Sequence, residues 1–268
     1  MTDISHIVTN GCSFTYGAEL EDPVNQAWPA IVAKKLNVPI VNIARPSIGN
    51  DAICRRTYEY FYEDLKNDNN PLYIIGFSAV TRKEYWNEKN KRYDGIHINK
   101  KNQKSFSSLD YAHKDYLENY DYEDFYRRNM LHRSSLRNLF NSHNIPYIFV
   151  SMMSDYKEKI TEIEIHNAKK SIKNKFSSYI DYVHDDLNDL KSLENIMSTD
   201  NFSFLPEGHY DANTNKYIGE NITSAILKRY QFAVINDKSF LTLSEFTRNV
   251  EKQYNMEWAE GFADAWQK

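Results

Sequence analysis

A serine near the start of the chain has the surroundings of a nucleophile. The apolar, β-branched run Ile7–Gly11 ends in glycine, and Ser13 follows within Gly11-Cys-Ser-Phe-Thr-Tyr-Gly17. A serine at a strand end, flanked by residues small enough for a tight turn, can present its hydroxyl group to solvent while its own N–H points at a substrate. The same residues also fit a plain turn in which Ser13 caps the next segment. Acyl transfer by serine is therefore one of two interpretations.

A second segment offers a group that could stabilise an anion. The apolar run at 39–44 is followed by Gly49, Asn50 and Asp51, where a helical pattern begins. Gly49 lets the backbone approach a ligand closely, and an N–H near a helix start can stabilise a negative charge. Asn50 or Asp51 can equally be an ordinary helix cap, and the two roles are compatible.

Apolar runs that alternate with helical patterns predict the fold class. Strands are expected at 7–11, 39–44, 71–77 and 146–151, with 180–184 as a fifth candidate, because near-continuous apolar runs are typical of strands buried on both faces. Helical patterns occupy about 28–36, 49–66, 115–142, 156–177 and 213–229. This order predicts a three-layer α/β/α sandwich with a mostly parallel sheet and right-handed crossovers.

Two stretches fall outside the alternation. Residues 82–114 are rich in Lys, Asn, Tyr and Ser, and we expect an insertion over the carboxyl edge of the sheet. The aromatic residues in and just after it suit a packed lid or a sugar-binding surface. In the tail, 237–268, apolar and aromatic residues recur every four positions, which predicts an amphipathic helix. We expect one α/β domain over 1–236 and a tail that packs on it or on a second subunit, as in a homo-oligomer.

Four segments in order resemble the motif blocks of the SGNH (GDSL-like) hydrolase family. Gly11–Gly17 resembles the first block, with Gly-Cys-Ser in place of Gly-Asp-Ser. The other three resemblances are Trp28-Pro29 with Asn42-Ile-Ala44 and Gly49-Asn50, then Ile75 to Trp86, and finally Gly208-His209 with Asn213 to Ile222. The third block of the family, which Ile75 to Trp86 resembles, has here the form seen in divergent, often phage-associated members. The resemblance covers about residues 5–230 and implies a flavodoxin-like sheet and serine esterase activity without a cofactor.

The resemblance also implies a role for each matched residue. Ser13 is the expected nucleophile, and its N–H and that of Gly49 are the expected oxyanion hole. His209 is the expected general base, which takes the serine proton and returns it to the leaving group. The third block of the family usually supplies an asparagine as a further donor, which this chain lacks, so Ser78 or Asn50 is the expected substitute.

The acid that orients the histidine departs from the family pattern. The family places an acid three residues before the histidine, where this chain has Pro206. Glu207 is the nearest carboxylate and the expected partner of His209, although a backbone carbonyl can do the same work. His97, in Asp94-Gly-Ile-His97, has the better spacing but lies in the insertion. Because the base of such a sheet arrives from the loop after the last strand, His209 is preferred.

Cys12 is the rival nucleophile beside Ser13. Adjacent side chains in an extended segment point to opposite faces, so a Ser13 that faces a cleft leaves Cys12 buried and inert. With only two cysteines, the chain has too few for a disulfide scaffold or a zinc ribbon, and no pair of histidines has metal-ligand spacing. We expect both thiols to be reduced and no metal site to be present.

The composition limits the classes of molecule that we expect this protein to bind. The 268 residues carry 33 basic and 37 acidic side chains, for a net charge of −4, which gives no general attraction to nucleic acid. The mean hydropathy is −0.69, and no run of about 18 apolar residues or export signal occurs. We therefore expect no membrane span and a cytoplasmic location, with association with a virion as the alternative.

These observations favour a serine esterase. We expect the substrate to be an O-acyl group on a carbohydrate or on another small polar molecule. The competing hypothesis is a non-catalytic binding or structural protein on an SGNH-like scaffold, such as a phage or capsule accessory protein. The missing asparagine of the third block and the irregular spacing of Glu207 and His209 support that alternative.

Overall fold

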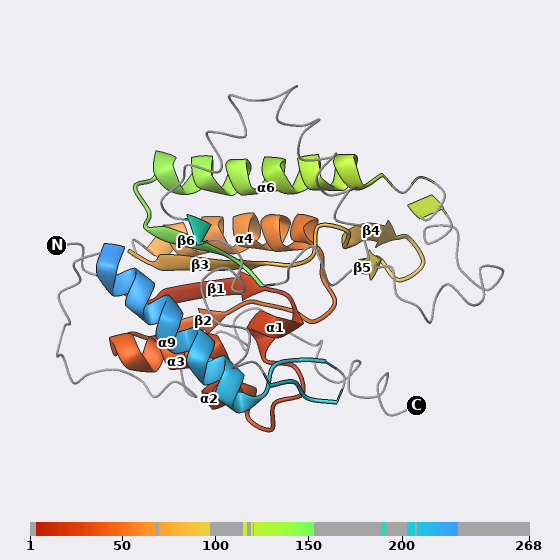
Figure 1. Cartoon of the computed structure of the whole chain (residues 1–268). Coiled ribbons are helices and arrows are strands. Elements are labelled where there is room, and N and C mark those ends of the chain that lie inside the picture. The colour runs from red at the N-terminus through yellow and green to blue at the C-terminus, as the bar shows by residue number, and fades with distance from the viewer. Residues whose placement is uncertain are drawn as a thin grey trace.

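Five parallel strands form the centre of the molecule (Figure 1). The computed structural model describes residues 4–67, 70–96, 115–116, 119, 121–152, 189–190, 203–206 and 208–229. The strands are β1 (Ile7–Gly11), β2 (Ile40–Asn42), β3 (Leu72–Phe77), β6 (Tyr147–Ser151) and β7 (Asp189–Leu190). Their order across the sheet is β2-β1-β3-β6-β7, and each described pairing is parallel. The predicted mostly parallel sheet is therefore confirmed, while the candidate strand at 180–184 lies outside the described residues.

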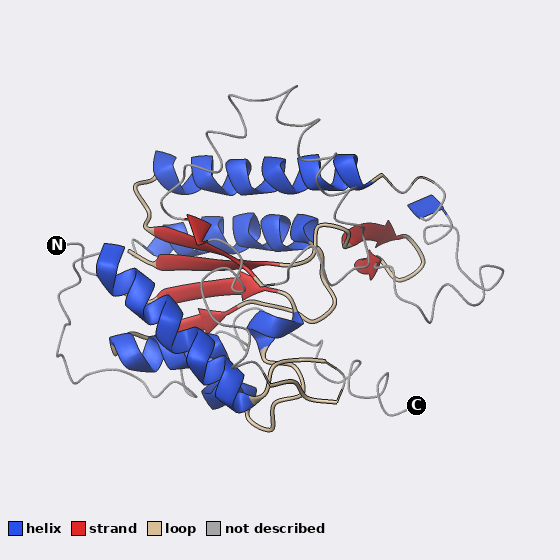
Figure 2. Ribbon diagram, in the orientation of Figure 1, coloured by secondary structure: helices blue, strands red, loops and turns tan. Residues whose placement is uncertain are grey.

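Helices cover both faces of this sheet (Figure 2). On one face lie α3 (Trp28–Leu36) and α9 (Ala212–Arg229), and on the other lie α4 (Asn50–Asp64), followed by a 3₁₀ turn, and α6 (Tyr122–Ser142). The short helices α1 (Ser13–Tyr16) and α2 (Pro23–Gln26) connect β1 to α3. The predicted three-layer α/β/α sandwich is confirmed. The helix predicted at 156–177 and the tail at 237–268 lie outside the described residues.

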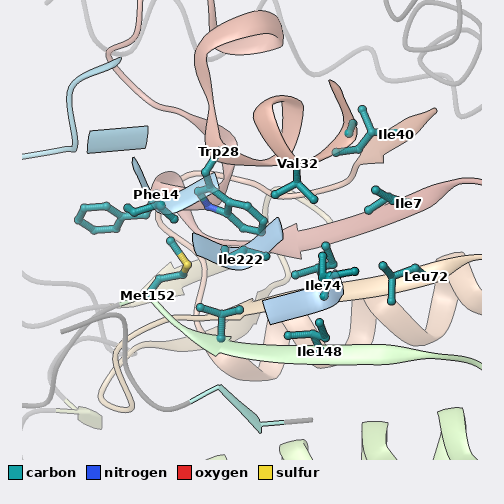
Figure 3. Close-up of a cluster of buried hydrophobic side chains, with 14 of the residues drawn as sticks. Ile7, Phe14, Trp28, Val32, Ile40, Leu72, Ile74, Ile148, Met152 and Ile222 are labelled. Atoms are coloured by element: carbon teal, nitrogen blue, oxygen red, sulfur yellow. The ribbon is translucent and has the colours of Figure 1, made fainter. Parts of the chain in front are cut away.

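Each face of the sheet carries its own hydrophobic core. Between the sheet and the helices α3 and α9, the strand residues Ile7, Ile74 and Ile148 pack against Trp28 of α3 and Ile222 of α9 (Figure 3). Removing one such side chain from water contributes about 1.5–3 kcal/mol. The core on the other face is built around aromatic rings, namely Phe61, Tyr73, Phe77, Phe140, Tyr147 and Phe149. The continuous apolar strands of the sequence thus reflect burial on both sides.

The first part of the insertion is an antiparallel hairpin. β4 (Lys83–Asn87) pairs with β5 (Arg92–Ile96), beyond the carboxyl ends of the central strands (Figure 1). The sequence did not predict these strands, because their polar residues lack a clear alternation. Contacts with α4 hold the hairpin instead: Arg55 donates through Nε and Nη2 to the two carboxylate oxygens of Glu84, at 2.9 and 2.8 Å. The rest of the insertion, from residue 97 to 114, lies outside the described residues.

None of the described helices combines the length and the apolar composition that a membrane crossing needs.

Candidate functional site

Ser13 is the first residue of α1, directly after β1. Ser13 and Cys12 are both buried, with exposed fractions of 5% and 0%. Cys12 is therefore buried as expected, but Ser13 is not open to solvent as its place at the strand end suggested. The Ser13 carbonyl accepts hydrogen bonds from the N–H groups of Gly17 and Ala18, both at 3.0 Å, and the helix ends where Gly17 adopts a φ of 86°. Within the described part of the chain, the Ser13 N–H has no acceptor. The Ser13 hydroxyl group therefore lies at the carboxyl edge of the sheet, next to an N–H that has no acceptor among the described residues.

Two asparagines fix the Ser13 loop. Asn10 Nδ2 donates to the Ile53 carbonyl and to Thr57 Oγ1, both at 2.9 Å, which joins the end of β1 to α4. Asn42 Nδ2 donates to the Thr15 carbonyl at 3.1 Å, which joins the end of β2 to α1. The motif comparison included Asn42, but nothing in the sequence marked Asn10. Both side chains therefore tie the segment that carries Ser13 to neighbouring elements of the fold.

Gly49 lies immediately before α4 and offers a second N–H. Among the described residues this N–H has no acceptor. A Cβ atom at Gly49 would lie 2.5 Å from the Arg82 carbonyl oxygen, so the neighbouring chain leaves no room for a side chain. The N-terminus of α4 carries a partial positive charge, which favours an anion at this position.

The segment after β3 is clamped to the start of α4 by Asn50. Asn50 Oδ1 accepts a hydrogen bond from the Ser78 N–H at 2.7 Å, and Asn50 Nδ2 donates to the Ser78 carbonyl at 3.0 Å. Nδ2 also donates to Asn129 Oδ1, on α6, at 2.9 Å. Both amide hydrogens of Asn50 are thus used within the protein. Asn50 and Ser78, two expected oxyanion donors, are bonded directly to each other.

His209 lies in the loop before α9 and contacts the residue next to Ser13. Its ring packs on Phe14, with the centroids 5.3 Å apart. Tyr210 packs on the same phenyl ring at 4.6 Å and donates from its hydroxyl group to the Met152 carbonyl, just after β6, at 3.3 Å. The structure therefore brings His209 to the loop that carries Ser13, from which it is separated by almost 200 residues in the sequence.

The carboxylate beside His209 belongs to Glu19. Glu19 Oε2 lies 2.8 Å from His209 Nδ1 and 3.3 Å from the His209 backbone nitrogen. Sequence reasoning missed Glu19, because no local spacing links a residue of the first loop to a histidine before the last helix. Glu207 and His97, the sequence-based candidates for the acid and for an alternative base, lie outside the described residues.

Burial changes the acid–base chemistry at the start of α4. Asp51 accepts hydrogen bonds from the N–H groups of Ala52 and Glu84, at 2.9 and 2.7 Å. Burial outweighs these bonds and raises the pKa of Asp51 to about 6. Burial also raises the pKa of the Cys54 thiol to about 12, with a contribution from Asp51, so Cys54 is a poor nucleophile.

A protein family matches a large part of the sequence. The family carries the description "Family of unknown function (DUF6071)", and it matches residues 18–168, more than half of the 268 residues. The chain belongs to this family. The region shared with DUF6071 includes Glu19, Gly49, Asn50 and Ser78 but neither Ser13 nor His209. A search of the curated proteins finds none that matches the sequence.

Solved structures similar to this DUF6071 member include several esterases. The psychrotrophic esterase EstA from Pseudoalteromonas sp. is 9% identical, with a TM-score of 0.50 over 85% of this chain and 100% of its own. A protein assigned to the lipolytic G-D-S-L family from Desulfitobacterium hafniense DCB-2 is 18% identical, with a TM-score of 0.44 over 82% and 99%. A carbohydrate esterase family 2 enzyme from Corynascus thermopiles (Myceliophthora fergusii) is 14% identical, with a TM-score of 0.46 over 85% and 67%. The match to EstA shows that this chain has an SGNH-like fold.

Proposed function

We propose that this protein is a serine esterase that acts through an acyl-Ser13 intermediate. The observation that carries the proposal is the packing of His209 on Phe14, the residue next to Ser13, with the ring centroids 5.3 Å apart. His209 Nδ1 is occupied by Glu19, which leaves Nε2 as the nitrogen that can accept the serine proton. The N–H groups of Ser13 and Gly49, which have no acceptor among the described residues, are the proposed donors to the developing oxyanion.

The reaction follows from these groups. Ser13 Oγ attacks the ester carbonyl carbon while its proton passes to His209 Nε2, and the carbonyl oxygen becomes an oxyanion that the N–H groups of Ser13 and Gly49 stabilise. The tetrahedral intermediate then collapses, and the alcohol leaves with the proton from His209. Water, activated by His209, attacks the acyl-serine and releases the carboxylic acid.

The β4–β5 hairpin supports the proposal that the alcohol part of the substrate is polar and ring-shaped, as in a sugar. Trp86 on β4 and Tyr93 on β5 are paired across the strands, and their rings pack edge to face at 5.2 Å. Each is nearly half exposed, and the hairpin lies beyond the carboxyl ends of the central strands (Figure 1). Exposed aromatic rings with polar tips suit a ligand that offers both C–H and O–H groups. The proposed substrate class is therefore an O-acylated carbohydrate.

A fluorophosphonate probe and a short-chain ester test the mechanism. We expect the probe to label the wild type and Ser142→Ala equally, and to leave Ser13→Ala unlabelled. Ser142 is a suitable control because it is an exposed serine at the C-terminal end of α6. Ester hydrolysis should fall in parallel with labelling. A folded wild-type protein that is neither labelled nor active would contradict the esterase and favour a non-catalytic binding protein on the same scaffold.

The carbohydrate proposal has its own test. With an acetylated oligosaccharide as substrate, Trp86→Ala should raise KM, while the rate with a small aryl acetate stays unchanged. Tyr62→Ala, which removes an exposed ring at the far end of α4, serves as the control. An equal effect of Trp86→Ala on both substrates would argue against a sugar-binding role of the hairpin.

A further inference from the structure

The loop that carries Ser13 also carries the carboxylate that contacts His209. Glu19 follows Ser13 by six residues, just beyond the end of α1. Glu19 Oε2 is 2.8 Å from His209 Nδ1, and the two side chains are only 21% and 19% exposed. An ionised carboxylate can only accept hydrogen bonds, so Nδ1 must carry the hydrogen when Glu19 is charged. The unprotonated nitrogen of a neutral imidazole is then Nε2.

The same carboxylate oxygen also holds the histidine backbone. The His209 N–H points at Glu19 Oε2 from 3.3 Å, in addition to the ring nitrogen at 2.8 Å. One oxygen therefore constrains both the main chain and the ring of His209. The imidazole also packs against the ring of Phe14, which limits its rotation. These contacts specify the position and the tautomer of His209 together.

The backbone at Glu19 adopts an uncommon conformation. Its φ of 68° lies in the left-handed region, which few residues other than glycine occupy. Gly17, two residues earlier, has a φ of 86°. Residues are held in such conformations where the surrounding structure fixes them, and these positions concentrate at functional sites. The turn that produces this conformation brings the Glu19 side chain to His209.

We propose that Glu19 is the positioning residue of the catalytic histidine, in the place that the sequence pattern assigned to Glu207. This inference rests on the proposed esterase function. Ser13 and its orienting acid then come from one loop, and His209 is the only member of the triad that comes from the distant end of the domain. The function of Glu19 is to keep the Nδ1–H tautomer and to stabilise the imidazolium that forms during acyl transfer.

Steady-state kinetics with a short-chain ester tests this role. Glu19→Gln keeps the length of the side chain and the backbone preference but removes the charge, and its amide can donate to Nδ1 and favour the wrong tautomer. We expect kcat to fall by at least about 10²-fold with KM changed by no more than about twofold. Glu19→Asp, which restores the charge with a shorter reach, should recover part of kcat. Glu21→Gln, an exposed neighbour, is the matched control and should behave as the wild type.

The rival acid is tested in the same series. If Glu207→Gln lowers kcat and Glu19→Gln does not, the proposal is overturned and the sequence-based assignment holds. If Glu19→Gln and Glu19→Ala retain wild-type kcat while Ser13→Ala is inactive, the serine mechanism stands and the role of Glu19 is wrong. If the wild type has no activity, the proposed function fails instead.

Nitrogen-15 NMR of the imidazole provides a readout that does not depend on activity. At about pH 8.5, where an ordinary imidazole is neutral, the wild type should show the Nδ1–H tautomer for His209. The His209 signals are identified as those absent from His209→Gln. Glu19→Gln should shift them toward the Nε2–H tautomer, while Glu21→Gln leaves them unchanged. An Nε2–H tautomer in the wild type would overturn the proposal whether or not the protein is an esterase.

Discussion

Asn50 and Ser78 are joined by two reciprocal hydrogen bonds. The Ser78 N–H donates to Asn50 Oδ1 at 2.7 Å, and Asn50 Nδ2 donates to the Ser78 carbonyl at 3.0 Å. Both residues are almost completely buried. The amide of Asn50 therefore pairs with the backbone N–H and carbonyl of Ser78, as a neighbouring strand would do within a sheet. The two hydrogen bonds tie the start of α4, where Gly49 lies, to the chain that leaves β3.

Substitution Asn50→Asp should destabilise the protein. A carboxylate would place an acceptor where Asn50 Nδ2 now donates, opposite the Ser78 carbonyl and Asn129 Oδ1. Unpaired buried polar groups cost about 1–3 kcal/mol each, so we expect the free energy of unfolding to fall by at least about 2 kcal/mol. Urea denaturation measures this change. Asn90→Asp, at an exposed position of the hairpin turn, should alter stability by less than about 0.5 kcal/mol. Equal effects of the two substitutions would show that the clamp contributes nothing.

Asp51 makes stability depend on pH. Burial raises its pKa to about 6 in the folded protein, above the value of about 3.9 in an unfolded chain. Between these pH values the folded state binds more protons than the unfolded state, so this group lowers stability as pH rises from about 4 to 6.

Comparison with Asp51→Asn isolates this contribution, because the other titrating groups are shared. The free energy of unfolding of the wild type should decrease relative to that of Asp51→Asn by about 2–3 kcal/mol between pH 4 and pH 7. Urea denaturation of both proteins at several pH values gives this difference. A difference that does not change with pH would mean that Asp51 has the same proton affinity in both states.

Gly49→Ala should impair the proposed oxyanion hole. The new methyl group would lie 2.5 Å from the Arg82 carbonyl oxygen, and because that atom belongs to the backbone, the loop has to shift. We expect a stability loss of about 1–3 kcal/mol and a fall in kcat of about 10²-fold or more, since the Gly49 N–H moves away from the oxyanion. Thermal unfolding and ester hydrolysis test the two effects separately. If Gly49→Ala were destabilised but kept the wild-type kcat, the Gly49 N–H would not be part of the oxyanion hole.

Gly219→Ala should weaken the packing of α9 on α3. A Cβ atom at Gly219 would lie 2.7 Å from Ile31 Cβ and 3.0 Å from the Trp28 carbonyl oxygen. Overpacking costs about 1–3 kcal/mol, which exceeds the roughly 1 kcal/mol that alanine gains over glycine in a helix. Thermal unfolding should therefore show a net loss of stability. Ser224→Ala, on the exposed side of α9, should instead raise stability slightly. If Gly219→Ala were more stable than the wild type, α9 would be able to shift away from α3 at little cost in free energy.

The sequence by itself determined the layers and the placement of the candidate nucleophile. Apolar runs and helical periodicity are local properties of the sequence, and a strand buried on both faces of a parallel sheet gives an almost continuous apolar run. The strands at 7–11 and 71–77 and the helix at 49–66 could therefore be predicted. Ser13 and Gly49 became candidates for the same reason, since each comes after a strand that ends at the carboxyl edge of the sheet, and their roles stay predictions. The hairpin at 83–96 was missed because contacts of Glu84 with α4, rather than its own alternation, hold it.

Only the tertiary structure decided the partners of the polar side chains. Glu19 reaches His209 across a sequence separation of 190 residues, and Asn50 reaches Ser78 and Asn129 across separations of 28 and 79. A buried hydrogen-bonding group accepts whichever partner the packing places within about 3 Å, and nothing in the local sequence specifies that partner. The spacing of Glu207 and His209 could therefore suggest an acid, but the folded loop after β1 places Glu19 against the imidazole.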